Sequence, residues 1–280
     1  MKIELAHNAG FCFGVKRAID MSFEVVKEQS NICSLGPLIH NKQVVDEFKS
    51  QGLTVVDEVE DLKNLDVNKV IIRSHGSKKS DYDYLDFNDI GIVDTTCPYV
   101  KKIQNIVYNH YKNGYKIIIL GNKNHPEIIG INGWCENKGI VVNSEEEFKN
   151  IEILENENYC FVSQTTMKLS IYNNIVNYLS EFANHVIIFN TICKATKNRQ
   201  ESASLLSKKV DLMIVIGGYH SSNTQKLAKV CSENVKTYHI ETINDLDLSI
   251  FNKDMQIGIT AGASTPDWII NEVLDTLKNL

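Results

Sequence analysis

The sequence predicts an α/β protein made of three similar α/β units with mainly parallel sheets. Short apolar runs typical of strands alternate with stretches whose apolar residues recur at helical spacing, and this alternation favours parallel pairing. A cysteine recurs at the same point of each unit, where an apolar run stops and a helix-like stretch begins. The interval from that cysteine to a glycine is 24 residues each time: Cys12 to Gly36, Cys97 to Gly121 and Cys193 to Gly217. A repeat of this size indicates repeated domains rather than a solenoid, whose repeats are shorter.

The first unit begins with a helix after Cys12, because apolar residues recur at helical spacing from Val15 to Gln29. The strand that follows ends in Gly36-Pro37, which is a turn signal. The elements expected in this unit, in order, are a helix at 15–29, a strand at 32–35, a helix at 42–51, a strand at 54–56, an acidic link at 57–61, a strand at 70–73, a polar helix-like run to about 88 and a strand at 92–93.

The second and third units repeat this order. In the second we expect a helix at 100–111, a strand at 116–120, a further helix, a strand at 140–142, an acidic link at 145–147, a strand at 159–162, a helix at 169–182 and a strand at 185–189. In the third we expect a helix at 198–209, a strand at 212–216, a further helix, a strand at 237–240, a link at 241–247, a strand at 256–260 and a final helix opened by Pro266 and Asp267.

The third unit lacks a closing strand after its last helix, whereas a strand at 2–5 is unused. We therefore expect the N-terminal segment to complete the third sheet and to close a ring of three. The domains would then be 14–96, 97–192 and 193–280, the last completed by 1–13. The alternative is that each strand belongs to the unit whose cysteine follows it, and short loops on both sides leave that choice open.

Composition narrows the function. The net charge is −6 and there is no long Lys/Arg run, which argues against a nucleic-acid binder. The N-terminus has no signal-peptide pattern, and no apolar run approaches the ~18 residues of a membrane span. The seven cysteines are an odd number without an export signal. We therefore expect a cytoplasmic protein with free thiols, no membrane contact, and any cysteine cluster metallic or catalytic.

The three repeated cysteines are candidates for a metal centre. Ligands of parallel sheets lie beyond the carboxyl ends of the strands, so three such rims facing one centre bring Cys12, Cys97 and Cys193 together. Thiolates are the ligands of iron–sulfur clusters, and three of them leave one iron of a four-iron cluster open. Zinc fits less well, because local Cys-x-x-Cys pairs are absent. The other four cysteines are interpreted as structural: Cys33, Cys135, Cys160 and Cys231.

A second group of residues suits an anion such as a phosphate or diphosphate. Each lies just after a predicted strand and offers hydrogen-bond donors. The group is His40, His75, His125, Ser221, Ser222, Asn223 and Ser264. A lone histidine is usually an ordinary surface or core residue, but three in equivalent loops favour a shared role. Ser264 or Thr265 before Pro266 also has a structural interpretation as a helix N-cap, and free N–H groups at such a terminus bind anions.

Glu127 and Thr165 are candidates for proton transfer. Glu127 follows His125-Pro126 at a predicted helix start, where an acidic residue is also favoured by the helix dipole. Thr165 and Thr166 follow a strand, where threonine is common. The functional interpretation is a proton donor near the open iron, with a threonine that passes or positions a proton.

Seven motifs, in order along nearly the whole chain, resemble those of the LytB family of 4-hydroxy-3-methylbut-2-enyl diphosphate reductases. They are Gly10-Phe11-Cys12-Phe13-Gly14-Val15-Lys16-Arg17-Ala18, Asp94-Thr95-Thr96-Cys97-Pro98, His125-Pro126-Glu127, Gln164-Thr165-Thr166, Thr191-Ile192-Cys193, Ser221-Ser222-Asn223 and Ala261-Gly262-Ala263-Ser264. The resemblance implies three α/β domains around a pseudo-threefold axis, with the N-terminal strand in the third. Asn8-Ala9 and His220 depart from the family pattern, and His220 is left out of the site.

The resemblance also implies a function and a set of roles. Cys12, Cys97 and Cys193 ligate one [4Fe-4S] cluster with an open iron, and the seven histidine, serine and asparagine residues named above hold the diphosphate. Glu127 supplies protons and Thr165 orients the substrate hydroxyl. The reaction is reductive dehydroxylation to isopentenyl diphosphate and dimethylallyl diphosphate, the last step of the methylerythritol phosphate isoprenoid pathway.

Three further expectations concern partners and rivals. The chain has no Gly-rich flavin or nicotinamide fingerprint, so electrons come from a partner such as ferredoxin or flavodoxin. The expected assembly is a monomer. Two other functions stay open: a different three-cysteine cluster enzyme, such as a dehydratase or quinolinate synthase, and a non-enzymatic iron–sulfur or zinc sensor.

Overall fold

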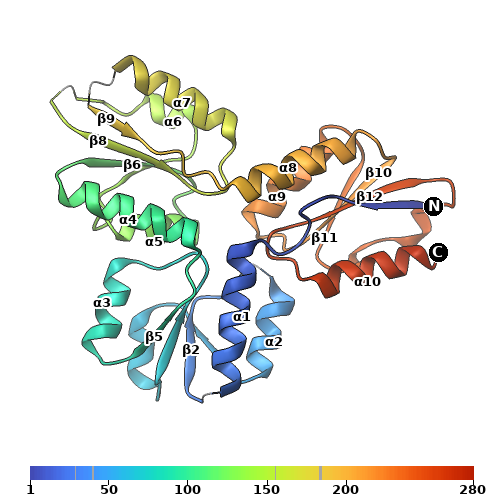
Figure 1. Cartoon of the computed structure of the whole chain (residues 1–280), viewed down its shortest axis with the longest axis horizontal. Helices are drawn as coiled ribbons and strands as arrows, with labels where there is room; N and C mark the ends of the chain where they lie inside the picture. The colour runs from blue at the N-terminus through green and yellow to red at the C-terminus, as the bar shows by residue number, and fades with distance from the viewer. Residues whose placement is uncertain (29, 40, 155, 183–184) are drawn as a thin grey trace. The chain divides into compact units, whose positions relative to one another are not determined.

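The structure, a computed structural model, describes residues 1–28, 30–39, 41–154, 156–182 and 185–280. Within these ranges the strands form three four-stranded sheets, and every strand pair is parallel. Helices alternate with the strands along the chain (Figure 1). The predicted α/β class, with three similar units and parallel sheets, is confirmed.

The three sheets have the same topology. The first has the order β3 (Thr54–Val56), β2 (Ile32–Leu35), β4 (Lys69–Ile72), β5 (Gly91–Asp94). The second has the order β7 (Ile140–Val142), β6 (Lys116–Leu120), β8 (Tyr159–Ser163), β9 (Val186–Ile188). The third has the order β11 (Thr237–Ile240), β10 (Leu212–Ile216), β12 (Gln256–Ala261), β1 (Lys2–Leu5). The central pair of every sheet is thus its first and third strand in chain order, if β1 is taken as the fourth strand of its sheet.

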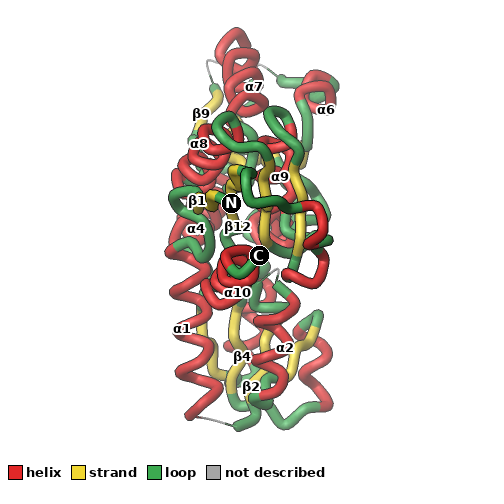
Figure 2. Tube along the Cα trace, turned by 90° about the vertical axis from the view of Figure 1, so that its right-hand side faces the viewer, coloured by secondary structure: helices red, strands yellow, loops and turns green. Residues whose placement is uncertain are grey.

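The N-terminal strand lies in the third sheet. β1 pairs with β12 in a register that matches Lys2 with Gln256 and Leu5 with Ile259. Figures 1 and 2 both show β1 beside β12, with the two ends of the chain close to each other. The strands before Cys97 and Cys193 likewise belong to the preceding sheet, because β5 pairs with β4 and β9 with β8. Each of these strands therefore belongs to the sheet that precedes its cysteine, and the N-terminal strand completes the third sheet. The alternative, in which each strand belongs to the unit whose cysteine follows it, is not what the structure has.

Helices connect the strands. They are α1 (Phe13–Glu28), α2 (Lys42–Ser50), α3 (Lys79–Phe87), α4 (Pro98–Lys112), α5 (Pro126–Gly133), α6 (Glu145–Lys149), α7 (Leu169–Phe182), α8 (Lys194–Ser207), α9 (Ser222–Ser232) and α10 (Asp267–Lys278). Three of them, α1, α4 and α8, begin one residue after a repeated cysteine. In α4, proline occupies the first turn and lacks only an N–H that would have no partner within the helix. Its buried residues recur at helical spacing: Val100, Ile103, Gln104 and Val107.

The chain divides into two compact units. The first comprises Met1–Lys16, Ile39–Phe48 and Lys194–Leu280 and contains the third sheet; the second comprises Arg17–Leu38 and Lys49–Cys193 and contains the other two sheets. The third sheet shows how each core forms. Alternate residues of β10 face opposite sides, so Ile214 packs with Ile269 and Val273 of α10. Met213 packs on the other face with Leu227 of α9. The expected boundaries of three separate domains stay a prediction.

Three local expectations were wrong. The acidic link at 145–147 is the start of the short helix α6, capped by Ser144, which accepts a hydrogen bond from the Glu147 N–H at 3.1 Å. Helix α8 begins at Lys194, not at Asn198. Neither Ser264 nor Thr265 caps α10, which begins at Asp267; Thr265 instead donates its hydroxyl to the Ile216 carbonyl at 2.9 Å.

Among the described residues, no helix has both the length and the apolar composition needed to cross a membrane.

Candidate active site

The candidate histidines, serines, Asn223, Glu127 and Thr165 follow the carboxyl ends of the central strand pairs, where parallel sheets place their ligands, and the candidate cysteines follow edge strands. The three glycines of the 24-residue interval occupy equivalent positions there. Each follows the first strand of its sheet and donates its N–H to the last residue of the neighbouring edge strand. The bonds run from Gly36 to Val56 (2.7 Å), from Gly121 to Val142 (2.7 Å) and from Gly217 to Ile240 (2.8 Å). The repeat seen in the sequence is therefore a repeat of hydrogen bonds.

The three repeated cysteines are also held in one way. Each stands just before a helix and donates its backbone N–H to a carbonyl in the loop after the third strand of the adjoining sheet. The bonds run from Cys97 to Ser74 (3.0 Å), from Cys193 to Thr165 (2.9 Å) and from Cys12 to Ala263 (3.2 Å). Each acceptor is a candidate site residue or lies next to one. Each of the three repeated cysteines is thus hydrogen-bonded to a loop that we expect to contact substrate.

The thiols of the chain fall into two classes. All seven are free; Cys12, Cys97 and Cys193 are partly exposed, and the other four are buried. Burial raises the pKa of Cys135 to about 11 and of both Cys160 and Cys231 to about 12, and it also raises the pKa of Cys33. A metal takes the thiolate, so the three accessible thiols fit an iron–sulfur cluster and the four buried ones do not.

The three repeated cysteines do not all lie in one compact unit. Cys12 belongs to the first unit, and Cys97 and Cys193 belong to the second. In the described ranges no three His, Cys, Asp or Glu side chains form a group that could hold a metal ion. The joint ligand set of three cysteines stays a prediction.

In the second compact unit, Thr165 forms hydrogen bonds with both Glu127 and Cys193. Glu127 lies in the first turn of α5 and is only 3% exposed, whereas Thr165 is 8% exposed. One Glu127 oxygen accepts the Thr165 backbone N–H at 2.6 Å, and the other accepts the Thr165 hydroxyl at 2.7 Å. The Thr165 carbonyl in turn accepts the Cys193 N–H at 2.9 Å. These contacts fix both side chains at the base of the Cys193 turn.

Two of the candidate histidines lie next to this pair. His125 caps α5, and its Nδ1 accepts the Glu127 backbone N–H at 3.1 Å. The His75 ring contacts the His125 ring edge to face, with centroids 5.6 Å apart. His75 follows Ser74, the residue that accepts from Cys97. The loops after β4 and β6 therefore bring two histidines and Glu127 together. His40 lies outside the described residues.

The first compact unit, which contains the third sheet, holds the remaining anion-binding candidates. Ser221 caps α9 by accepting the Thr224 N–H at 3.3 Å, and Ser222 and Asn223 form the first turn of that helix. Asn223 is buried, yet neither polar atom of its amide has a hydrogen-bond partner among the residues that the structure describes. Buried amides are normally satisfied, so an orphaned one at a helix N-terminus fits a site for an anion.

The loop with Ser264 approaches this turn closely. A Cβ atom on Gly262 would lie 2.1 Å from the Thr224 Oγ1 of α9, so only glycine lets the two segments meet. Ser264 is itself buried, and the residue before it accepts the Cys12 N–H. One region of the first compact unit thus contains four of the anion-binding candidates: Ser221, Ser222, Asn223 and Ser264.

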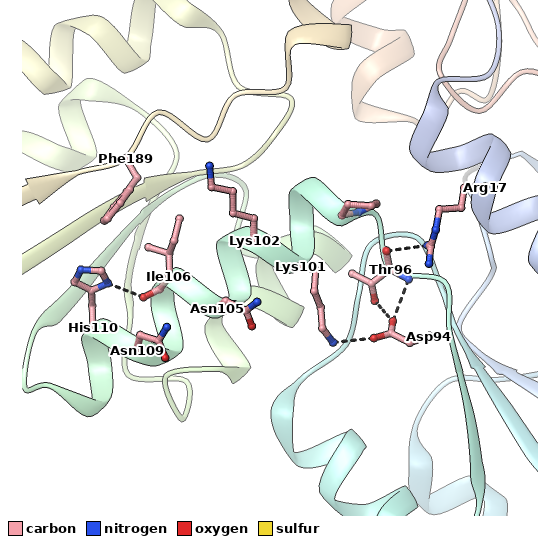
Figure 3. A pocket seen from close by; sticks show the side chains of 11 residues that line it. Arg17, Asp94, Thr96, Lys101, Lys102, Asn105, Ile106, Asn109, His110 and Phe189 are labelled. Carbon is pink, nitrogen blue, oxygen red and sulfur yellow. Dashed lines mark hydrogen bonds and ion pairs between the residues drawn. The ribbon is translucent and has the colours of Figure 1, made fainter.

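Two arginines that the sequence analysis did not single out support the cysteine turns. Arg199 of α8 is 2% exposed and donates to the Gly10 carbonyl at 2.8 Å, two residues before Cys12. Arg17 of α1 donates to the Thr96 carbonyl at 3.3 Å, one residue before Cys97 (Figure 3). No direct signal for these contacts was present in the sequence, because the partners are 79 and 189 residues away along the chain.

Asp94 stabilises the Cys97 turn from the strand side. Its carboxylate accepts hydrogen bonds from the Lys101 ammonium at 2.7 Å and from the Thr96 N–H at 3.1 Å (Figure 3). Burial acts to raise the pKa of Asp94, but the hydrogen bonds from Lys101 and Thr96 outweigh it and the pKa is lowered. The Lys101 ammonium also lies 4.4 Å from the centre of the Tyr82 ring and 5.2 Å from that of Trp134. Lys101 is therefore held by a charge and two aromatic faces.

Comparison with known proteins agrees with this geometry. The family model described as LytB protein matches residues 3–278. The chain belongs to the LytB family. Its relatives include the 4-hydroxy-3-methylbut-2-enyl diphosphate reductase of Clostridioides difficile (strain 630), 51% identical over 281 residues and 100% of both chains. That of Caldanaerobacter subterraneus subsp. tengcongensis is 50% identical over 283 residues, which cover 100% of this chain and 98% of the relative.

Solved structures of the LytB family also match. The E-1-hydroxy-2-methyl-but-2-enyl-4-diphosphate reductase of Plasmodium falciparum has a TM-score of 0.91 at 29% identity and covers 99% of this chain and 88% of its own. An (E)-4-hydroxy-3-methyl-but-2-enyl diphosphate reductase, described as the terminal enzyme of the non-mevalonate pathway, has a TM-score of 0.74 at 40% identity over 100% of both chains. The family suggested by the sequence motifs is thus confirmed.

Proposed function

We propose that this LytB-family chain is a reductase that converts 4-hydroxy-3-methylbut-2-enyl diphosphate to isopentenyl diphosphate and dimethylallyl diphosphate. Two electrons and two protons enter. The allylic C–O bond breaks, the hydroxyl leaves as water, and a C–H bond forms at either end of the allylic fragment. The names of relatives about 50% identical over their whole length support this reaction.

The observation that carries the proposal is the group formed by Glu127, Thr165 and Cys193. A departing hydroxyl needs a proton, and Glu127 is a buried carboxyl group whose hydrogen-bond partner is the hydroxyl of Thr165. Thr165 is the more exposed of the two, so its hydroxyl is suited to pass the proton on and to orient the substrate hydroxyl. The backbone hydrogen bond from Cys193 to Thr165 holds this pair beside Cys193.

We further propose that Cys12, Cys97 and Cys193 hold one [4Fe-4S] cluster. When bound, the cluster supplies the electrons for the cleavage and a Lewis-acidic iron without a protein ligand. The accessibility of these three thiols, against the raised pKa of the buried ones, supports this assignment.

The diphosphate would be held by donors from several loops. Ser221, Ser222 and Asn223 present the N-terminus of an 11-residue helix, with the unpaired Asn223 amide, and Ser264 adjoins them. We propose that His75, His125 and His40 complete this set. Binding the diphosphate away from the reacting carbon positions the hydroxyl, so these residues act on kcat as well as on KM.

Anaerobic purification tests the proposal. Wild-type protein is expected to contain about four iron and four sulfide ions per chain and, with excess reduced methyl viologen, to yield both diphosphate products. Cys97→Ser should lose iron and activity, whereas Cys33→Ser, a change at a buried thiol, should keep both. Consumption of substrate without a reductant would instead favour a dehydratase. An iron-loaded protein that turns over no diphosphate would favour a sensor.

A further inference from the structure

A pocket of about 590 Å³ runs along α4 within the second unit (Figure 3). Pro98, Lys102, Asn105 and Asn109 of α4 line it, with Arg17 of α1 and Phe189 after β9. Along α4 the lining extends from Pro98 to His110, a rise of roughly 18 Å along the helix. We call this lining the α4 strip. It is a long, shallow feature rather than a closed cavity.

The α4 strip is positively charged in a negative chain. Arg17, Lys101 and Lys102 line it against a single acid, Asp94, so its formal charge is 3 − 1 = +2, with histidine neutral. The whole chain carries −6. Asp94 is already neutralised by its ion pair with Lys101, whereas the Lys102 side chain is exposed. Arg17 and Lys102 therefore supply the positive charge of the strip that is not neutralised by Asp94.

One end of the strip lies at Cys97, one of the three proposed cluster ligands. Pro98 lines the pocket and is bonded to Cys97, which is partly exposed. The Tyr99 side chain, next along α4, is half exposed. Aromatic side chains of this kind often anchor protein interfaces. A molecule seated on the strip would thus reach the backbone of the Cys97 turn.

We propose that the α4 strip docks a small acidic protein that carries one electron at a time. The inference rests on the proposed function, because the reduction consumes two electrons and the chain has no Gly-rich fingerprint of a flavin or nicotinamide site. Two reduced carriers are each oxidised by one electron in turn. Weak electron-transfer encounters use small interfaces, and charge complementarity sets their association rate.

The shape of the strip favours a protein over a small anion. A small-anion site needs donors that converge, but here the donors are spread along one helix face. Pro98 has no N–H to offer, and Arg17 already donates to Thr96. Lys102, Asn105 and Asn109 are exposed side chains of α4, which suits contact with a complementary protein surface (Figure 3).

The test compares two electron sources for the anaerobic holoenzyme. Lys102→Glu and Asn105→Asp each add negative charge to the strip, and neither residue belongs to the proposed substrate-binding set. With a reduced acidic flavodoxin at low salt, kcat/KM for the carrier should fall about tenfold in Lys102→Glu and less in Asn105→Asp. Turnover with saturating reduced methyl viologen should stay at the wild-type level. Lys208→Glu makes an equal charge change at an exposed residue just after the C-terminal end of α8, and it should leave both rates unchanged.

Salt dependence adds a second readout. The carrier-driven rate of the wild type should fall as salt rises, and the rate of Lys102→Glu should fall less. Equal carrier kcat/KM in Lys102→Glu and Lys208→Glu would overturn the docking site. So would a loss of dye-driven turnover in both strip variants, or inorganic diphosphate bound by the wild type and lost in Lys102→Glu. A wild type that reduces no substrate even with the dye would instead overturn the proposed function.

Discussion

Through its backbone and its hydroxyl, Thr165 links an acid to a cysteine turn. Its N–H and hydroxyl each donate to one oxygen of Glu127, and its carbonyl accepts from Cys193. The two hydrogen bonds are 2.6 and 2.7 Å long, so the Glu127 carboxyl group is held closely against Thr165. The same two residues are thus available for holding the turn and for moving a proton.

Glu127→Gln should abolish most turnover without loss of the cluster. An amide keeps the size of the side chain but has no transferable proton, and it offers one acceptor oxygen where Thr165 presents two donors. We expect kcat to fall roughly 10²- to 10⁴-fold with excess reduced dye, at unchanged iron content. Glu24→Gln, an exposed change on α1, is the matched control. Wild-type kcat in Glu127→Gln would leave Glu127 as a residue favoured only by the helix dipole.

Thr165→Val and Thr165→Ser separate the hydroxyl from the methyl group. Valine removes the proton path and the bond to Glu127 but keeps the shape, so kcat should fall, though less than in Glu127→Gln. Serine keeps the hydroxyl and should retain most activity. Single-turnover rates with pre-reduced enzyme measure this, with iron content as the check on integrity. If serine were as impaired as valine, the role of Thr165 would be packing rather than orientation.

At the scale of elements, the cysteine turns depend on neighbours that are remote in sequence. The Cys12 turn is held by Ala263 and Arg199, and the Cys97 turn by Ser74 and Arg17. The Gly10 backbone has φ = +87°, a conformation that favours glycine and that the Arg199 bond helps to fix. Each turn is therefore positioned by tertiary contacts and not by its local sequence alone.

Arg199→Ala should loosen the Cys12 turn. It removes the hydrogen bond to Gly10 and leaves a void at a site that is 2% exposed, so the free energy of unfolding should drop by about 3 kcal/mol. Iron per chain should fall, and the electron paramagnetic resonance lines of the remaining reduced cluster should broaden. Arg199→Lys should restore part of the occupancy. Glu201→Ala, on the same helix with a solvent-exposed ion pair, should change neither quantity. Full iron content and unchanged spectra in Arg199→Ala would contradict the positioning role.

Across the whole molecule, the three repeated cysteines are partly exposed and the other four are buried. The repeated cysteines follow edge strands and stand before helices, where solvent reaches them. The others lie within buried strands and helices or, for Cys135, just after α5. The charge is also uneven, since a chain of −6 carries a positive strip beside one of the accessible thiols.

This division predicts the alkylation pattern of native apoprotein. At pH 8 a thiol with a pKa of about 12 is ionised to roughly one part in 10⁴, and burial also blocks the reagent. Iodoacetamide should therefore modify Cys12, Cys97 and Cys193 and spare Cys135, Cys160 and Cys231, as mass spectrometry of peptides would show. After denaturation all seven should react. Early modification of Cys231 in native protein would contradict the assignment.

Much of the fold could be predicted because strong periodicity coincided with turn residues. The strands at 116–120, 140–142, 212–216 and 237–240 and the helix at 169–182 have the predicted bounds. Helix α8 was placed too late because Lys194, Ala195, Thr196 and Lys197 show no apolar period; its buried residues include Thr196 and Arg199. Helix α6 was missed because a five-residue helix with one buried residue, Phe148, leaves no periodic pattern.

The candidate site was only partly predictable for a related reason. Residue types and loop positions indicated Glu127, Thr165 and the histidines, and the structure brings Glu127, Thr165, His75 and His125 together. Arg17 and Arg199 were missed because an arginine on a helix is ordinary until its partner is known. Those partners are 79 and 189 residues away in the chain.

The pairing of β1 with β12 has a consequence for synthesis. Lys2 and Gln256 are 254 residues apart, so the first strand to leave the ribosome cannot pair until β12, the last strand described, has been made. At 5–20 residues per second that delay is on the order of tens of seconds. During it, Cys12 lacks the Ala263 carbonyl that holds its turn, while Cys97 and Cys193 already have the partners that hold theirs. In a nascent chain the Cys97 and Cys193 turns can therefore form before the Cys12 turn. Iron bound before release would then meet an incomplete set of the three proposed ligands.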